Sequence, residues 1–234
     1  MNVLLLGVNG DIGNSIFHEI YNEKDNFYIS YSKSKPILKK KNIVFIKFDF
    51  RKKISLSKNR LLKNIFFELV INNVGDSNPY KNIELLKQEE LFKSLKINFI
   101  TPFSIILEII KKNVKKKIKT NIINISSNTV KFYGSKKNFQ YFISKSSLDN
   151  SLLYLSRHYS KNNIKINIIR PGVIRTNKTT KLKNYSNNKF LEREKLIPMK
   201  RAGSPRDIAK LVGYLSNKGS DFVKGQIISV SGGE

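Results

Sequence analysis

The chain has 234 residues, no cysteine, two histidines and a formal net charge of +27. This composition excludes disulfides, thiolate metal sites, a cysteine nucleophile and a histidine-rich metal site, so no metal centre is expected. The length fits a single α/β domain over residues 1–234. No apolar run approaches the roughly 20 residues of a membrane span. Met1–Gly7 lacks the basic start of a signal peptide, so we expect a cytoplasmic location.

The positive charge has two interpretations. Clustered lysine and arginine would indicate nucleic-acid binding, because such clusters release counterions from phosphate. The lysines are instead spread along the chain, and the densest groups, residues 39–41 and 111–119, fall beside predicted turns. This distribution favours a codon bias toward lysine, asparagine and isoleucine, and we expect no nucleic-acid partner. An anionic substrate or an acidic partner would still be attracted to this surface.

The N-terminal segment combines a strand, a glycine turn and a helix. Residues 2–6 are a continuous apolar run, as expected for a parallel strand covered on both faces. Gly7-Val-Asn-Gly10-Asp-Ile-Gly13 follows, and residues 14–21 have a helical pattern. Glycines allow the backbone to approach a pyrophosphate, whose charge the helix N-terminus favours. The segment therefore predicts dinucleotide binding, with a tight βα turn that binds nothing as the alternative.

The end of the next predicted strand, residues 27–31, indicates which dinucleotide is bound. An acidic residue there would hydrogen-bond the ribose of NAD, whereas a basic residue suits the 2′-phosphate of NADP. The sequence continues Ser32-Lys33-Ser34-Lys35, without an acidic residue. The two lysines, Lys33 and Lys35, therefore favour NADP(H) over NAD(H), unless they are simply part of a lysine-rich chain.

Two more strands are predicted over residues 43–48 and 67–72, with a short helix over residues 55–64 between them. Asp49 closes the first of these strands and is a candidate to hydrogen-bond an adenine amino group, or else it begins a turn. The second strand ends in Asn72-Asn73-Val74-Gly75. Its amides are placed to tie neighbouring strands together, and its glycine lets the chain turn beside the cofactor.

A long helix is predicted over residues 88–113, because apolar residues recur there at helical spacing. Pro102 lies inside it. Since proline has no N–H, the carbonyl of Asn98 loses its helical partner and the helix should kink. We expect the freed carbonyl to hold an ordered water near the reaction site. A kink that only shapes the packing is the alternative.

Ser127, Tyr141 and Lys145 are candidate catalytic residues. Residues 121–127 indicate a buried strand that runs into a loop, and Ser127 ends this run. Residues 139–160 indicate a helix on which Tyr141 and Lys145, four residues apart, share one face. A serine at a strand end that faces a tyrosine–lysine pair would form a hydrogen-bonded acid site.

The C-terminal part continues the alternation of strands and helices. A strand over residues 164–169 leads into Pro171-Gly172-Val173, and Thr176 is placed to reach the amide or the phosphates of a cofactor. Residues 177–196 are polar and lysine-rich, which indicates a mobile lid over a ligand or a plain surface excursion. Ser204-Pro-Arg-Asp207 predicts the capped start of a helix, and one more strand follows.

In this order the motifs resemble the short-chain dehydrogenases/reductases almost from end to end. The matching residues are the glycine turn, Asn72-Asn73-Val74-Gly75, Asn98, Ser127, Tyr141-x-x-x-Lys145, Pro171-Gly172 and Thr176. Residues 197–233 look like the C-terminal third of 3-oxoacyl-acyl-carrier-protein reductases. The resemblance implies one doubly wound Rossmann domain, in which a parallel sheet of about seven strands has helices on both faces.

The resemblance also implies residue roles. Ser127 would hydrogen-bond the substrate oxygen, and Tyr141 would act as general acid. Lys145 would bind the nicotinamide ribose and lower the pKa of Tyr141, while Asn98 would anchor the water that returns protons. The implied cofactor-binding residues are Gly7, Asn9, Gly10, Asp11, Ile12, Gly13, Ser32, Lys33, Asp49, Asn73, Gly75, Tyr141, Lys145, Pro171, Gly172, Val173 and Thr176.

Four departures from the family pattern are present, and none removes a catalytic group. Leu6 replaces the usual threonine before the first glycine, and Val74 replaces the usual alanine of Asn-Asn-Ala-Gly. The glycine spacing is G-x-x-G-x-x-G instead of G-x-x-x-G-x-G, which predicts a turn that differs by one residue. The chain ends soon after Gly232-Gly233, where relatives often continue to complete a subunit contact.

The predicted function is hydride transfer between NADP(H) and a carbonyl or secondary alcohol. The first hypothesis for the substrate is a 3-oxoacyl thioester on an acidic carrier protein, and the alternative is a sugar or a cell-surface polysaccharide precursor. The hypotheses from other classes are a cofactor-binding protein without turnover and a nucleic-acid-binding protein. An intact catalytic set argues against the former. By resemblance, the apolar stripes of the Asn98 and Tyr141 helices would also form a homodimer or homotetramer.

Overall fold

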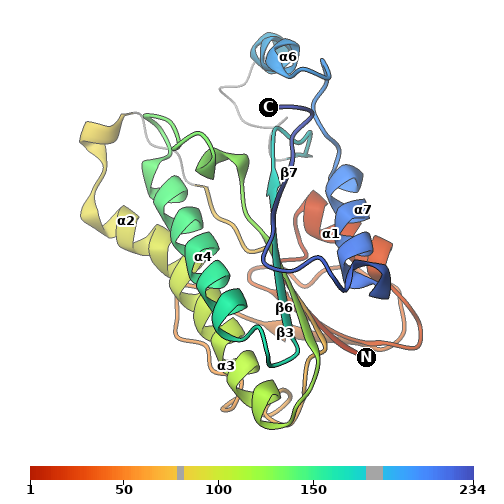
Figure 1. The fold of residues 1–234 in the computed structure, drawn as a ribbon. Helices are drawn as coiled ribbons and strands as arrows, with labels where there is room; N and C mark the ends of the chain where they lie inside the picture. Colours follow the sequence, from red (N-terminus) through yellow and green to blue (C-terminus); the bar gives the residue numbers. More distant parts are fainter. Residues whose placement is uncertain (78–81, 178–186) are drawn as a thin grey trace.

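The computed structural model describes residues 1–77, 82–177 and 187–234. Its centre is a sheet of seven parallel strands in the order β3-β2-β1-β4-β5-β6-β7 (Figure 1). The strands are β1 (Asn2–Leu6), β2 (Asn26–Tyr31), β3 (Ile43–Lys47), β4 (Leu69–Asn72), β5 (Thr120–Ile125), β6 (Ile164–Pro171) and β7 (Ile227–Val230). The predicted doubly wound sheet is confirmed.

Helices cover both faces of the sheet (Figure 1). One face carries α1 (Asp11–Ile20) and α7 (Pro205–Ser216), which pack together. The other face carries α2 (Gln88–Leu95), α3 (Thr101–Lys115) and α4 (Phe139–His158). A further helix, α6 (Asn187–Leu196), lies beyond the sheet near the C-terminus. The remaining helical pieces are single turns, η1 (Ile83–Leu85), η3 (Asn128–Val130) and η4 (Lys218–Ser220).

The core lies on both sides of the sheet, and successive residues of β1 show this. Leu4 belongs to the buried cluster that contains Ile106 of α3 and Leu152 of α4. Its neighbour Leu5 belongs to the opposite cluster with Phe17 of α1. Because both faces of a parallel strand are buried, its sequence is continuously apolar instead of alternating.

The helical path predicted over residues 88–113 is present but divided. A π-helical turn at Lys96–Ile100 separates α2 from α3. This wider turn ends two residues before Pro102, which has no N–H to offer to the carbonyl of Asn98. Turns of this kind are frequent at functional sites. The predicted irregularity is therefore present at the predicted position.

The prediction of a helix over residues 55–64 is wrong, because these residues form consecutive turns. The carboxylate of Glu108 in α3 accepts hydrogen bonds from the N–H groups of Leu56 and Ser57, at 2.9 and 2.6 Å. The side chain of Asn59 accepts another from the N–H two residues further on, at 2.9 Å. Side-chain acceptors thus compete with the backbone for the donors that a helix would use.

The connection from β2 to β3, residues 32–42, is fully described and also contains no helix. Parallel strands are usually joined through a crossover helix. Both crossovers at this side of the sheet are therefore irregular, and the edge strand β3 is only partly buried along Ile43–Phe45.

The C-terminal helix α7 begins as predicted. The Ser204 hydroxyl accepts a hydrogen bond from the N–H of Asp207 at 3.3 Å, and the Asp207 carboxylate accepts one from the N–H of Ser204 at 2.7 Å. This reciprocal capping satisfies two donors of the first turn. Within the described ranges, no helix has both the length and the apolar composition needed to cross a membrane.

Candidate active site

The predicted site residues gather around one cavity of 1710 Å³ at the carboxyl ends of the strands. Doubly wound sheets bind ligands at this edge, where the strand order reverses, here between β1 and β4. The predicted residues that line the cavity are Gly7, Asn9, Gly10, Asp11, Ile12, Ser32, Lys33, Asp49, Asn73, Gly75, Ser127, Tyr141, Lys145, Pro171, Gly172 and Thr176. Gly13, Asn98 and Val173 lie outside this lining.

Close contacts require two of the three glycines in the turn. Gly7 has a φ of +81°, and a Cβ there would lie 2.8 Å from the carbonyl oxygen of Asn73. A Cβ at Gly13 would lie 2.4 Å from the carbonyl oxygen of Gly7. At Gly10, with φ at −82°, a Cβ would meet no heavy atom of the described residues within 4 Å. Open space therefore lies before the N-terminus of α1, as a bound pyrophosphate requires.

The glycine turn keeps its usual span. In both G-x-x-G-x-x-G and G-x-x-x-G-x-G the first and third glycines are six residues apart, as Gly7 and Gly13 are. Only the middle glycine is displaced, from the position of Asp11 to that of Gly10. The prediction of a turn that differs by one residue is therefore wrong. The change instead places a carboxylate at the first position of α1.

Gly13 is tightly packed and Gly10 is open, so alanine substitutions at these two positions form a matched pair. Gly13→Ala should lower stability by about 1–3 kcal/mol, because the new methyl group overlaps backbone atoms, and should weaken nucleotide binding. The free energy of unfolding of Gly10→Ala should stay within about 0.5 kcal/mol of that of the parent protein. Thermal unfolding and nucleotide titration of both variants test this, and equal effects at the two positions would contradict it.

Tyr141 and Lys145 lie on one face of α4, as predicted. The Lys145 ammonium is buried and donates hydrogen bonds to the carbonyl oxygens of Val74 and Ile125, at 2.8 and 2.9 Å. Both side chains border Gly75, where a Cβ would lie 3.4 Å from Lys145 Nζ and 3.7 Å from the Tyr141 hydroxyl. The ends of β4 and β5 therefore fix the ammonium beside the phenol.

Ser127 completes this cluster from the loop after β5. Its hydroxyl interacts with the phenol of Tyr141 and lowers the pKa of that phenol. The same hydroxyl lies 3.0 Å from Thr129 Oγ1 and accepts a hydrogen bond from the Thr129 N–H at 3.2 Å. The structure therefore places the strand-end serine at the same cavity as the tyrosine–lysine pair, and the acid role of this group stays a prediction.

The electrostatics differ from the expectation that Lys145 lowers the pKa of Tyr141. Burial raises the pKa of Tyr141 to about 12, with Asp149 and Asp76 adding to the rise and the Ser127 hydroxyl opposing it. Burial also lowers the pKa of Lys145 to about 8, against the opposing charge of Asp149. Because the ammonium is directed at two backbone carbonyls, desolvation of the phenol dominates.

Sequence reasoning missed a buried acid behind the cluster. Asp149 lies four residues after Lys145 on α4, and its carboxylate accepts hydrogen bonds from Ser126 Oγ at 2.8 Å and Arg170 Nε at 3.0 Å. Asn124 donates a third, longer bond at 3.3 Å. Burial raises the pKa of Asp149. The signal was the continuation of the Tyr141–Lys145 face by one more helical turn.

Asn98 lies in the π-helical turn and joins three segments. Its Nδ2 donates to the carbonyl of Asp76 at 3.0 Å and to the hydroxyls of Ser144 and Ser94 at 3.0 and 3.1 Å. Its Oδ1 accepts from the N–H of Asp76 at 2.8 Å. The side chain thus fixes the chain after Gly75 against α4, while its role in holding a water stays a prediction.

The cavity has a basic rim at the ends of β2 and β3. Asp49 pairs with Arg51 through two hydrogen bonds, from Nε at 2.8 Å and from Nη2 at 2.9 Å. These bonds lower the pKa of Asp49 to about 2. The adenine contact predicted for Asp49 stays a prediction, and Arg51 was missed. The basic lining residues at this end are Lys33, Lys47, Arg51, Lys52, Lys53 and Lys58.

The segment after β6 packs closely against the C-terminus. A Cβ at Gly172 would lie 2.7 Å from the Cβ of Ser231, and the carbonyl of Val173 accepts a hydrogen bond from the N–H of Gly203 at 2.9 Å. Of the predicted lid, residues 178–186 lie outside the described residues. Residues 187–196 form α6, a helix that the polar and weakly periodic sequence did not reveal.

Two ion pairs hold α6. Arg175 reaches Glu194 at 2.7 Å, and Arg193 pairs with Glu234. In the part of the chain that the structure describes, no group of three or more histidine, aspartate or glutamate side chains is placed to hold a metal ion.

Sequence comparison agrees with the geometry. Residues 64–234 match the family model described as enoyl-(acyl carrier protein) reductase. The chain is 30% identical over 168 residues to the 3-oxoacyl-acyl-carrier-protein reductase FabG of Buchnera aphidicola subsp. Acyrthosiphon pisum, a match that covers 71% of this chain and 66% of that protein. FabG of Chlamydia trachomatis is 26% identical over 235 residues, with 99% and 86% covered.

Similar solved structures share the fold at lower identity. A short-chain dehydrogenase family protein from Francisella tularensis has a TM-score of 0.85 at 23% identity and covers 99% of this chain and 97% of its own. An Agrobacterium tumefaciens protein with bound NADP has 0.85 at 21%, with 99% and 95% covered. A 4-hydroxyisoleucine dehydrogenase with NADH has 0.84 at 21%, with 99% and 97% covered. The chain therefore belongs to the short-chain dehydrogenase/reductase family and is an oxidoreductase.

Proposed function

We propose that this oxidoreductase uses NADPH to reduce a carbonyl group, and that its substrate is a 3-oxoacyl chain carried as a thioester on acyl carrier protein. The observation that carries the reaction type is the phenol of Tyr141, which interacts with the Ser127 hydroxyl and lies beside Lys145. This cluster shares one cavity with the glycine turn. The similarity to FabG proteins supports the substrate class.

The residues around the cavity fit a dinucleotide. The open space at Gly10 and the N-terminus of α1 would receive the pyrophosphate. Ser32 and Lys33 would face the ribose phosphate of the adenosine part, whereas Thr176 would reach the nicotinamide amide. Lys145 would hydrogen-bond the nicotinamide ribose.

The chain's own groups handle the proton and the charge. NADPH, when bound, supplies hydride to the carbonyl carbon. Ser127 then hydrogen-bonds the oxygen on which negative charge develops, and Tyr141 transfers its phenolic proton to that oxygen. Tyr141 retains this proton before reaction, because its pKa is raised to about 12. Lys145 stabilises the phenolate that remains, and a water at Asn98 would return the proton.

The cofactor preference is tested by Lys33→Asp. Loss of one charge-assisted contact to a phosphate is worth about 1.5–3 kcal/mol, so the NADPH-to-NADH ratio of kcat/KM should fall about tenfold or more. Lys35→Asp is the matched control, because the Lys35 ammonium lies over the Phe45 ring at 4.8 Å. An unchanged ratio in Lys33→Asp would contradict the preference for NADP(H).

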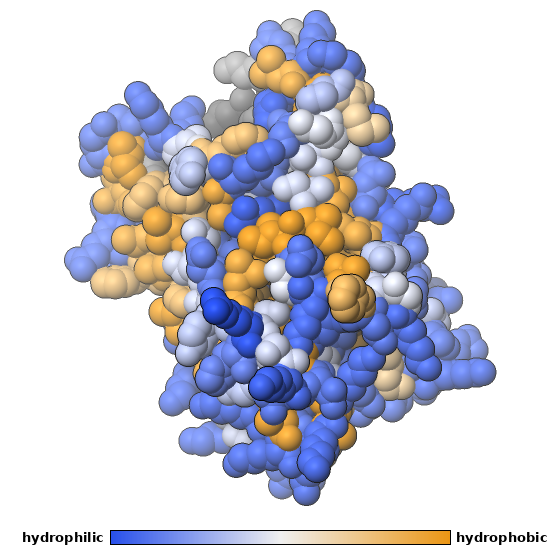
Figure 2. Space-filling view, viewed as in Figure 1, coloured by the Kyte–Doolittle hydropathy of each residue, from blue (hydrophilic) through white to orange (hydrophobic). Residues whose placement is uncertain are grey.

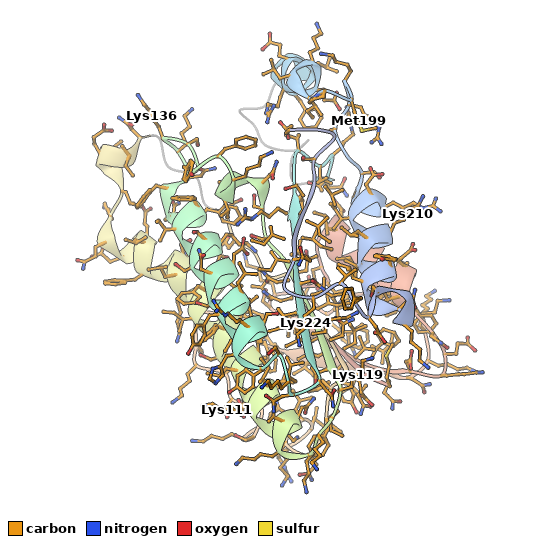
Figure 3. All side chains as sticks on the ribbon, viewed as in Figure 1. Lys111, Lys119, Lys136, Met199, Lys210 and Lys224 are labelled. Atoms are coloured by element: carbon orange, nitrogen blue, oxygen red, sulfur yellow. The ribbon has the colours of Figure 1, made fainter. Side chains whose placement is uncertain are left out.

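The surface charge is compatible with an acidic carrier protein. The labelled lysines Lys111, Lys119, Lys136, Lys210 and Lys224 lie in different parts of the molecule (Figure 3). These five lysines do not form a single stripe of the kind that tracks a nucleic-acid backbone. A dispersed positive field would still attract an acidic partner, with an association rate that falls as salt increases.

The substrate class is tested by NADPH oxidation with a panel of keto compounds. Turnover of acetoacetyl thioesters, faster on acyl carrier protein than on a small thiol, would support the proposal. Activity with keto sugars alone would favour the sugar or polysaccharide-precursor alternative. Activity with neither, in protein that binds NADPH, would remove both substrate classes.

We also propose that the protein forms a homodimer or homotetramer. Exposed apolar side chains lie along the outer surface of α2, the following turn and α4, where Phe92, Ile100 and Tyr154 are 59%, 42% and 66% exposed. Figure 2 shows apolar surface over this region. Patches of this kind mark contacts between proteins. Light scattering after gel filtration tests the assembly, and a monomer at micromolar concentration would overturn it.

A further inference from the structure

The glycine turn is held from the opposite side of the cavity. Asp11, the first residue of α1, accepts two hydrogen bonds from Asn177, one from the backbone N–H to Oδ2 and one from Nδ2 to Oδ1 at 2.9 Å. Asn177 directly follows Thr176, in the segment that leaves β6. Both residues line the cavity, so the contact connects its two walls.

The charge at this contact needs an explanation. The N-terminus of a helix attracts anions, and in this fold that position receives the pyrophosphate. A carboxylate on the same turn would compete with the phosphates if it pointed at them. Both oxygens of Asp11 instead point at Asn177, while Gly10 leaves the space before the helix open.

We propose that Asp11 and Asn177 form a strap across the pyrophosphate site that slows release of the nucleotide. The proposal rests on the proposed use of NADP(H). Asp11 is then a positioning residue: it holds the segment of Thr176 against the glycine turn, and a nucleotide leaves only after these bonds break. Asp11 stands where the family pattern has its middle glycine. A glycine there would have no side chain to accept the two hydrogen bonds from Asn177, so the aspartate has a role in the strap.

The strap predicts a specific kinetic pattern. Charge-assisted hydrogen bonds are about twice as strong as neutral ones, so losing both should raise the NADPH dissociation rate about tenfold. Asp11→Ala removes the whole acceptor. Asn177→Ala keeps the backbone N–H and should give a smaller increase, about threefold. Because product release limits many enzymes of this kind, kcat should stay level or rise while the Kd for NADPH increases.

The test is stopped-flow measurement of NADPH release from the two single variants and the double variant. The strap requires that Asn177→Ala accelerates release in the parent protein and has no further effect when Asp11 is already alanine. Asn14→Ala, an exposed position one turn further along α1, is the control and should leave the rate unchanged. Thermal unfolding of the nucleotide-free variants identifies a purely structural effect.

Three outcomes would overturn the strap. The first is an unchanged release rate in Asn177→Ala, and the second is additive effects of the two substitutions. The third is slower release in Asp11→Ala, which would show that repulsion between Asp11 and the phosphates dominates. Failure of the parent protein to bind NADPH or NADH would instead overturn the proposed function, and the strap would then have no ligand. Binding by the parent with unaltered release in the variants removes the strap alone.

Discussion

Replacing Tyr141 by phenylalanine should lower kcat/KM for carbonyl reduction by about 10²–10⁴-fold, the usual contribution of a general acid. The substitution removes one hydroxyl and keeps the ring, so the packing of α4 is retained. NADPH affinity should change little, because the phenol acts on the substrate oxygen and Lys145 carries the ribose contact. NADPH oxidation and fluorescence titration of NADPH measure the two quantities separately.

The same helix supplies the control for this experiment. Tyr154 is 66% exposed on α4, and its ring stacks on His158 with centroids 5.7 Å apart. Tyr154→Phe removes a hydroxyl from the same helix without touching the cavity, so turnover should remain normal. Retained turnover in Tyr141→Phe would contradict the assigned chemistry.

Replacing Lys145 by methionine should lower kcat by about 10²–10³-fold, the typical loss for one preorganised charge that stabilises a developing anion. Unlike Tyr141→Phe, it should also weaken NADPH binding. Stability should fall by about 1–3 kcal/mol for each carbonyl left without its donor, at Val74 and Ile125.

A second buried lysine separates the catalytic loss from the structural one. Lys165 of β6 donates to the carbonyl of Leu215 at 3.1 Å, and to the carbonyl and hydroxyl of Ser220 at 3.2 and 2.9 Å. Lys165→Met should therefore lower stability by a similar amount and leave kcat unchanged. If both variants lost activity in proportion to stability, the catalytic role of Lys145 would be refuted.

The pH dependence follows from the pKa of Lys145, lowered to about 8 from its ordinary value of 10.5. Activity should decline as pH rises through about 8, because the ammonium that stabilises the phenolate loses its charge. Stability behaves oppositely. The buried charge destabilises the fold below pH 8, and this cost disappears as pH rises from about 8 to 10.5. Kinetic and unfolding profiles of the parent and Lys145→Met measure both effects.

The sequence predicted that Ser127, Tyr141 and Lys145 would lie together, because its signals are local. The Tyr141–Lys145 spacing determines a shared helix face, Ser127 ends an apolar run, and Pro102 locates the irregular turn at Asn98. The strands are rich in isoleucine, valine and leucine, although Asn124 interrupts β5 and Lys165 and Asn167 interrupt β6, and their pattern and length made the sheet predictable. The glycine turn could be recognised because strand, glycines and helix follow each other without a gap.

The remaining features depend on contacts between distant segments. The turns at residues 55–64 form because Glu108, far along the chain, accepts their N–H groups. Arg170 reaches Asp149 only after β6 is placed beside β5. The raised pKa of Tyr141 depends on how deeply its hydroxyl is buried, which residue spacing does not determine. The residue pattern of a single segment therefore could not predict these turns, this ion pair or this pKa.

Because two strand connections lack helices, the β3 edge of the sheet should open locally more easily than the centre of the sheet. Hydrogen exchange reports local opening, which is easiest where few buried contacts cover the backbone. The edge strand β3 and residues 32–42 meet this description, while β4 and β5 lie at the centre of the sheet. Amide protection should thus be graded across the sheet, low beside Lys33 and high beneath Lys145. A bound nucleotide would contact both the segment near Lys33 and the segment near Lys145. It should therefore increase amide protection most at the β3 edge, where the nucleotide-free protein is protected least.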